Sequence, residues 1–184
     1  MKLVYSVTLM LTLTAGNAWA AFEGNETTSF GLGAGSAAGD VAGSGNTFVG
    51  RNAGLSTTGI SNTFVGYFSG LNNTTGFQNT FVGRGAGRDN TVGAYNTFIG
   101  MLTGNLNTTG EYNTFVGQGA GRDNTTGINN TYLGQVAGRF NTTGSYNTYI
   151  GKGAGDNNAT GGSNTFLGHL AGLNSTGGGP CLFR

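Results

Sequence analysis

Several residue types are scarce in this chain of 184 residues. Cysteine, proline, histidine and tryptophan occur once each, and charged residues make up 8% of the chain. The lone Cys181 excludes an intramolecular disulfide framework and a cysteine-based zinc site. The eight basic and seven acidic residues nearly balance and form no basic patch. Because nothing would neutralise phosphate charge, we expect no nucleic-acid partner.

The same scarcity removes most catalytic chemistry. The single histidine, His169, follows the last copy of the repeat described below, and we expect it to be a solvated turn residue. Arg88-Asp89 and Arg122-Asp123 are adjacent opposite charges, which usually form solvated pairs that contribute little. We therefore predict a protein that is not an enzyme and that has no cofactor and no bound metal.

What the chain does contain is glycine, asparagine and threonine in a fixed period, with 38 glycines in all. The pentamer Asn-Thr-aromatic-aliphatic-Gly occurs eight times, at an interval of 16 residues once and 17 residues thereafter. A looser frame joins the copies, as in Gly117 to Gly127. A fixed period of this kind indicates a repeat architecture.

Each pentamer has the composition of a β-strand, because threonine, aromatic and branched aliphatic residues are enriched in strands. We expect a second short extended piece at Gly119-Ala120-Gly121, and a turn at Asn-Thr-Thr-Gly in which asparagine and glycine adopt positive φ. The predicted fold is all-β: a parallel β-solenoid, in the form of a left-handed β-roll, built from eight rungs of 16–17 residues. Rungs stacked about 4.8 Å apart would form a rod roughly 40 Å long.

Stacked rungs place equivalent residues above one another, and side chains alternate across a strand. With the aromatic residue directed inward, the predicted core column is Phe48, Phe64, Phe81, Phe98, Phe115, Tyr132, Tyr149 and Phe166. The predicted amide ladder, with each side chain bonded to the rungs above and below, is Asn46, Asn62, Asn79, Asn96, Asn113, Asn130, Asn147 and Asn164.

The other two positions of the strand would then face outward. This candidate interface or binding face consists of Thr47, Val49, Thr63, Val65, Thr80, Val82, Thr97, Ile99, Thr114, Val116, Thr131, Leu133, Thr148, Ile150, Thr165 and Leu167. A contiguous row of exposed aliphatic side chains usually marks an interface. The alternative is that aromatic and aliphatic residues both point into the core, on either side of a bend.

The regions outside the pentamers differ in composition. Residues 1–20 have the pattern of a secretory signal peptide: a basic start, an apolar run, and Ala18-Trp19-Ala20 as the cleavage site. Residues 21–45 are expected to form a degenerate first repeat or an N-terminal cap, and residues 46–177 the solenoid. Residues 178–184 form a C-terminal tail or a truncation. We expect a mature chain without a transmembrane helix that is secreted or held at the cell surface.

The pentamers and the Ala-Gly pairs, such as Ala120-Gly121 and Ala137-Gly138, resemble the head repeats of YadA-like trimeric autotransporter adhesins. In that family short units ending in glycine stack into a left-handed parallel β-roll, and three chains pack side by side. The present repeat is longer and carries a bulky aromatic residue. The resemblance implies an exported adhesin-like protein that binds a host, matrix or surface ligand and assembles as a homo-oligomer, most simply a trimer.

The pentamers are also similar to the Asn-x-Val-x-Gly rungs of β-solenoid ice-binding proteins, which expose flat threonine ladders to ice. A Thr-x-Val column suits that function chemically. The aliphatic position, however, varies among valine, isoleucine and leucine, whereas a lattice match favours uniform short side chains. Adhesion or surface binding is therefore the favoured hypothesis, and ice binding is the alternative.

Overall fold

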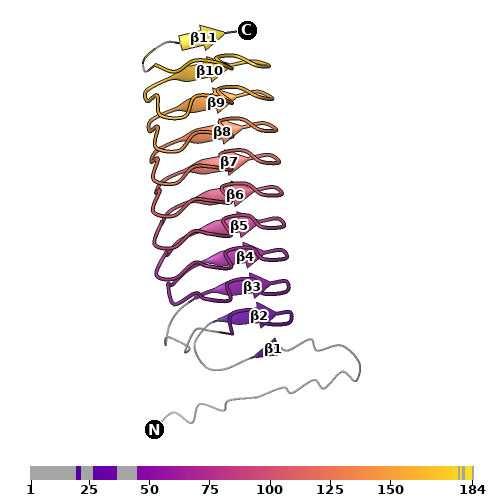
Figure 1. Ribbon diagram of the computed structural model, residues 1–184. Helices are drawn as coiled ribbons and strands as arrows, with labels where there is room; N and C mark the ends of the chain where they lie inside the picture. The colour runs from indigo at the N-terminus through magenta and orange to yellow at the C-terminus, as the bar shows by residue number, and fades with distance from the viewer. Residues whose placement is uncertain (1–19, 22–26, 37–44, 178, 180, 184) are drawn as a thin grey trace.

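A computed structural model describes residues 20–21, 27–36, 45–177, 179 and 181–183. It shows an all-β rod in which one short strand recurs in every turn of a solenoid (Figure 1). The strands are β1 (Ala20–Ala21), β2 (Thr28–Phe30), β3 (Thr47–Val49), β4 (Thr63–Val65), β5 (Thr80–Val82), β6 (Thr97–Ile99), β7 (Thr114–Val116), β8 (Thr131–Leu133), β9 (Thr148–Ile150), β10 (Thr165–Leu167) and β11 (Cys181–Phe183). The predicted parallel β-solenoid is confirmed.

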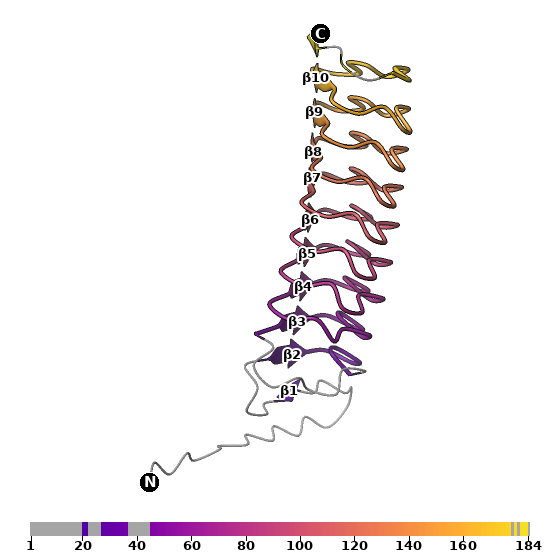
Figure 2. The same ribbon diagram turned by 90° about the vertical axis from the view of Figure 1, so that its left-hand side faces the viewer.

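The strands form a single sheet in sequence order, with β2 to β11 parallel and β1 antiparallel to β2. The register aligns each pentamer with the next one, so that Thr97 pairs with Thr114 and Phe98 pairs with Phe115. Seen from the side, the strands line one edge of the rod and the turns lie behind them (Figure 2). Equivalent residues of successive rungs therefore lie in columns along the rod.

The core is a single stack of aromatic rings. All eight pentamer aromatics are at most 1% exposed, and from Phe64 to Phe166 successive ring centroids are 4.6–4.9 Å apart. Each ring buries on the order of 150 Å² or more, which makes this stack the main apolar stabiliser. Small residues such as Ala120 close the core from the opposite side, and a Cβ on Gly121 would overlap the Phe115 ring.

The pentamer asparagines are buried, but they bond the main chain and not one another along most of the rod. Asn113 Oδ1 accepts from the backbone N–H of Asn130 at 2.9 Å, and Asn113 Nδ2 donates to the Gly127 carbonyl at 2.8 Å. Both partners belong to the following rung. The predicted contact to the rungs above and below is therefore made through the backbone on one side, where the Asn113 N–H donates to Asn96. Only the last step, from Asn164 to Asn147, adds an amide-to-amide bond within this series.

The turns differ from two expectations. Gly119-Ala120-Gly121 forms no strand; it is part of a turn in which Gly119 and Gly121 have positive φ. The Asn-Thr-Thr-Gly segment, in contrast, does not rely on positive φ at Asn124 or Gly127. Glycine is required at 127 because the next rung approaches it so closely that a Cβ would overlap the Gly144 carbonyl. The left-handed residue of this corner is the one just before each pentamer, for example Asn129 with φ 55°.

Both ends of the solenoid carry further strands. In β2 the aromatic position is taken by Ser29, which pairs with Phe48, and Gly35 donates to the Ala53 carbonyl as in later rungs. At the other end β11 pairs in parallel with β10, with Leu182 aligned to Phe166. The described parts of 21–45 and of 178–184 thus continue the stack. The predicted signal sequence lies, except for Ala20, outside the described residues.

Candidate functional site

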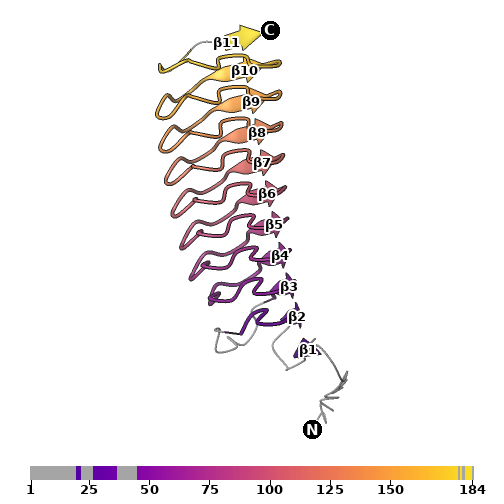
Figure 3. The ribbon, with the colours of Figure 1, turned by 45° about the vertical axis from the view of Figure 1, so that its right-hand side comes forward.

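The candidate site is the strand face, defined as the sixteen threonine and aliphatic residues on the outer side of β3 to β10. In every one of these strands the middle aromatic is buried while its two neighbours are half-buried or exposed. The alternation of a β-strand explains this, because adjacent side chains point to opposite faces. The structure therefore brings all sixteen residues onto one side of the rod, seen nearly edge-on in Figure 3.

The aliphatic column of this face is substantially open. Ile99 is 40% exposed and Leu133 is 48% exposed, and Ile150 and Leu167 lie in the same range. The alternative arrangement, with aliphatic and aromatic residues both in the core, is therefore not the one in the structure. A continuous line of eight such side chains is more than scattered surface apolarity, and it is typical of a surface that another molecule covers.

Beside it runs the threonine column. Its members pair in register from β3 to β10, each threonine aligned with a threonine of the next strand. Neighbouring strands lie about 4.8 Å apart. The hydroxyl groups therefore form a regular row parallel to the row of aliphatic groups. The face combines hydrogen-bonding and apolar groups with one repeat per rung.

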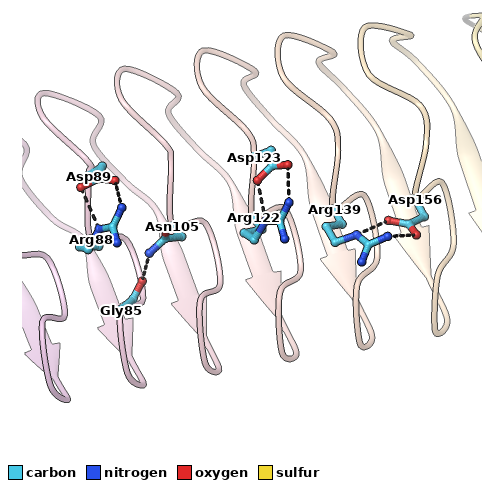
Figure 4. Close-up of polar contacts among 8 residues, drawn as sticks. All are labelled: Gly85, Arg88, Asp89, Asn105, Arg122, Asp123, Arg139 and Asp156. Carbon is cyan, nitrogen blue, oxygen red and sulfur yellow. Dashed lines mark hydrogen bonds and ion pairs between the residues drawn. The ribbon is translucent and has the colours of Figure 1, made fainter.

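A second set of polar residues lies in the turn that follows each strand (Figure 4). Arg88 binds Asp89 and Arg122 binds Asp123 within one turn, whereas Arg139 reaches across to Asp156 of the next rung, 3.0 Å away. The hydrogen bond from Arg88 lowers the pKa of the Asp89 carboxyl. Burial raises the pKa of the Asp156 carboxyl, because loss of solvent outweighs the attraction of Arg139. These are ion pairs with a structural role, and they do not converge as catalytic acid and base.

Other features of the described chain offer no reactive constellation. His169 is exposed. Among the residues that the structure describes, no group of three or more histidine, cysteine, aspartate or glutamate side chains is placed to hold a metal ion. Within the same residues no helix has the length and apolarity of a membrane span.

An asparagine column that sequence reasoning missed lies in the Asn-Thr-Thr-Gly turns. Asn107 Nδ2 donates to Asn90 Oδ1 at 2.6 Å, and Asn124 Nδ2 donates to Asn107 Oδ1 at 2.7 Å. This turn column, which runs through Asn73, Asn90, Asn107, Asn124 and Asn141, is the true amide-to-amide ladder. Four of its members match the pattern of a glycosylation acceptor, but all are fully buried. The folded chain therefore does not present them for glycosylation, and the spacing that revealed them as turn residues was the available signal.

Comparison of the chain with protein family models, with curated proteins and with solved structures found no match.

Proposed function

We propose that the protein is an exported, non-enzymatic surface-binding module of the adhesive type, assembled through its strand face. The observation that carries the proposal is the open aliphatic column of the strand face, which a single chain leaves uncovered. Each such side chain would gain on the order of 1 to 2 kcal/mol from burial. The resemblance of the pentamers to adhesin head repeats points in the same direction.

Self-association is the simplest way to cover this column. Packing three strand faces around one axis buries all columns at once and leaves no open copy of the interface, as cyclic symmetry allows. The assembly we propose is therefore a homotrimer with a left-handed β-roll in each chain. Its turns, on the side away from the strands, would remain available to a host, matrix or other surface ligand.

The assembly is tested by a double substitution, Ile99→Asp with Val116→Asp. Light scattering should give a trimer for the wild-type protein and a monomer for the variant, while circular dichroism shows an unchanged β-solenoid. Thr126→Ala, an exposed turn residue, serves as a control that leaves the assembly intact. A wild-type protein that is a monomer at micromolar concentration would refute the assembly.

The adhesive function needs a separate test. Beads coated with the purified protein should be retained on surfaces coated with extracellular-matrix proteins, and beads coated with albumin should be washed away. Equal retention of the two bead types would contradict adhesion while leaving the assembly question untouched.

Ice binding is the second candidate, and the in-register threonine column supports it. Eight threonines at one per rung give a regular row of hydroxyl groups flanked by aliphatic groups. Thermal hysteresis measured on the purified protein tests this function directly. Hysteresis that disappears on Thr114→Tyr, in a variant that stays folded, would replace adhesion with ice binding.

A further inference from the structure

We propose that a pit in the turns between β6 and β9 is a binding site for one uncharged pyranose ring. The pit lies outside the strand face, and the inference does not depend on the proposed adhesive function. It has a volume of about 180 Å³ and is open to solvent on one side. Its lining residues are Met101, Leu102, Gln118, Gly119, Arg122, Gln135, Val136 and Arg139.

The pit has a clear origin in the sequence. The second residue after each pentamer glycine alternates between glycine and a larger residue along this part of the rod: Gly85, Leu102, Gly119, Val136, Gly153 and Leu170. Each larger side chain extends over the glycine of the preceding rung. A Cβ placed on Gly153 would lie 2.6 Å from Leu170 Cδ2, and one on Gly85 would lie 3.1 Å from Leu102 Cδ2.

The cover over Gly119 is shorter than the other two. A Cβ on Gly119 would lie 3.5 Å from its nearest neighbour, Val136 Cγ1. Valine lacks the additional carbon with which leucine closes the other two positions. The floor at Gly119 therefore remains open between Leu102 and Val136, and the pit forms there.

Its polar wall is held in place before any ligand arrives. Two hydrogen bonds tie Arg122 to Asp123, at 2.6 and 2.7 Å, and two tie Arg139 to Asp156, at 3.1 and 3.0 Å. The ring of Phe140 supports both guanidinium groups, whose central carbons lie 5.4 and 4.1 Å from its centroid. A guanidinium has five N–H donors. Each arginine thus retains donors that its carboxylate does not use.

The opposite wall carries two amide side chains. Gln135 Nε2 donates to Gln118 Oε1 at 3.2 Å, and this contact aligns the two amides in adjacent rungs. Gln135 keeps a free carbonyl oxygen and a further N–H, and Gln118 keeps its N–H₂ group. The pit therefore offers both donors and acceptors around an apolar floor.

This combination selects the ligand class. The two arginines are offset by Asp123 and Asp156, so an anion gains no net charge attraction. Planar amide and guanidinium groups can bond adjacent hydroxyl groups, and the apolar side chains of Leu102 and Val136 can contact the C–H face of a sugar ring. The volume corresponds to roughly six waters at about 30 Å³ each, which suits one pyranose. A few convergent polar groups in a partly apolar hollow are typical of small-molecule sites.

The test uses the full protein and three probes, glucose, galactose and N-acetylglucosamine, followed by nuclear magnetic resonance of the Gln118 and Gln135 amides and the Val136 methyl groups. We expect saturable shifts with at least one probe and a dissociation constant on the order of 1 mM, since only one ring is bound. Acetate should produce no comparable shift. Absence of a saturable shift for all three sugars, or tighter binding of acetate, would overturn the proposal.

Val136→Leu is the decisive variant, because leucine already occupies the equivalent positions 102 and 170 and should fold without strain. It should close the pit and weaken binding at least tenfold, with an unchanged circular dichroism spectrum. Gln118→Ala combined with Gln135→Ala should also lose binding while keeping the pit open. Arg88→Gln, which breaks an equivalent ion pair outside the pit, should bind like the wild type. Binding that survives Val136→Leu would refute the site, and none of these variants alters the strand face.

Discussion

The rings of Phe98 and Phe115 lie 4.9 Å apart and within 8° of parallel, in adjacent rungs of the solenoid. Both are completely buried, and the ring of each touches a glycine of its own rung, Gly104 or Gly121. The stack thus has no space into which neighbours could relax if one ring were removed. Continuity of the ring column is what ties each rung to the next.

Phe115→Ala should therefore lower the free energy of unfolding by about 3 to 5 kcal/mol, the usual cost of deleting a fully buried aromatic ring. Chemical denaturation followed by circular dichroism measures this loss. Thr126→Ala, at an exposed turn position of the same rung, should change it by less than about 0.5 kcal/mol. Similar losses for the two variants would show that the ring column is not the main apolar stabiliser.

Asn113→Ala tests the pentamer asparagines. The substitution leaves the Gly127 carbonyl and the Asn130 N–H without their buried partner. Each unpaired group costs about 1 to 3 kcal/mol, so the free energy of unfolding should fall by about 2 to 6 kcal/mol. Exposed Thr109→Ala in the preceding turn is the control. A loss no larger than that of the control would mean that water replaces the side chain.

Tyr132→Phe should stabilise the protein. The Tyr132 hydroxyl is buried without a hydrogen-bond partner in the described chain, and the nearby Asn147 amide already donates to the Gly161 carbonyl. Six of the eight rungs carry phenylalanine at this position. Removing an unpaired hydroxyl should raise the free energy of unfolding by about 1 to 3 kcal/mol, seen as a higher melting temperature. A lower melting temperature would show that the hydroxyl is satisfied after all.

The same tyrosine predicts the alkaline behaviour. Burial raises the pKa of Tyr132 well above its ordinary value of 10.0. An acid whose pKa is raised on folding contributes stability below its unfolded pKa and loses it as pH rises above that value. The wild-type protein should therefore lose stability from about pH 10 upward. Tyr132→Phe combined with Tyr149→Phe should remove much of this loss, and an unchanged alkaline limb would contradict the assignment.

Two carboxyl groups should give opposite responses to acid. The pKa of Asp89 is lowered, so its contribution is present above the unfolded value of 3.8 and is lost as pH falls. The pKa of Asp156 is raised, so its contribution is present below 3.8 and is lost as pH rises. We expect effects below about 1 kcal/mol for such partly exposed pairs.

Denaturation of Asp89→Asn and Asp156→Asn between pH 3 and pH 7 separates the two. The stability difference between wild type and Asp89→Asn should grow with pH, and that between wild type and Asp156→Asn should shrink. Two differences that change in the same direction would show that one of the two pKa shifts has the wrong sign.

The sequence by itself determined the solenoid, the ring column and the two outward columns. A 17-residue period with one strand in each copy forces equivalent residues into line, and alternation along Thr114-Phe115-Val116 then places the ring inside. These are local rules applied in every rung, so that no long-range contact had to be known. The expected amide ladder at Asn113 was only partly correct, because alternation gives the direction of a side chain and not its partner.

The tertiary structure decided what depends on the contact between rungs. Asn107 reaches Asn124 through the path of the turn, which brings the two amides within 2.7 Å and which no period can supply. The strand β11 forms although the pentamer is lost, because the edge of β10 offers unpaired backbone groups to any chain that follows it. The pit at Gly119 exists because Val136, in the rung above, is one carbon shorter than leucine. Its shape follows from the packing of side chains 17 residues apart, which only the stacked rungs bring together.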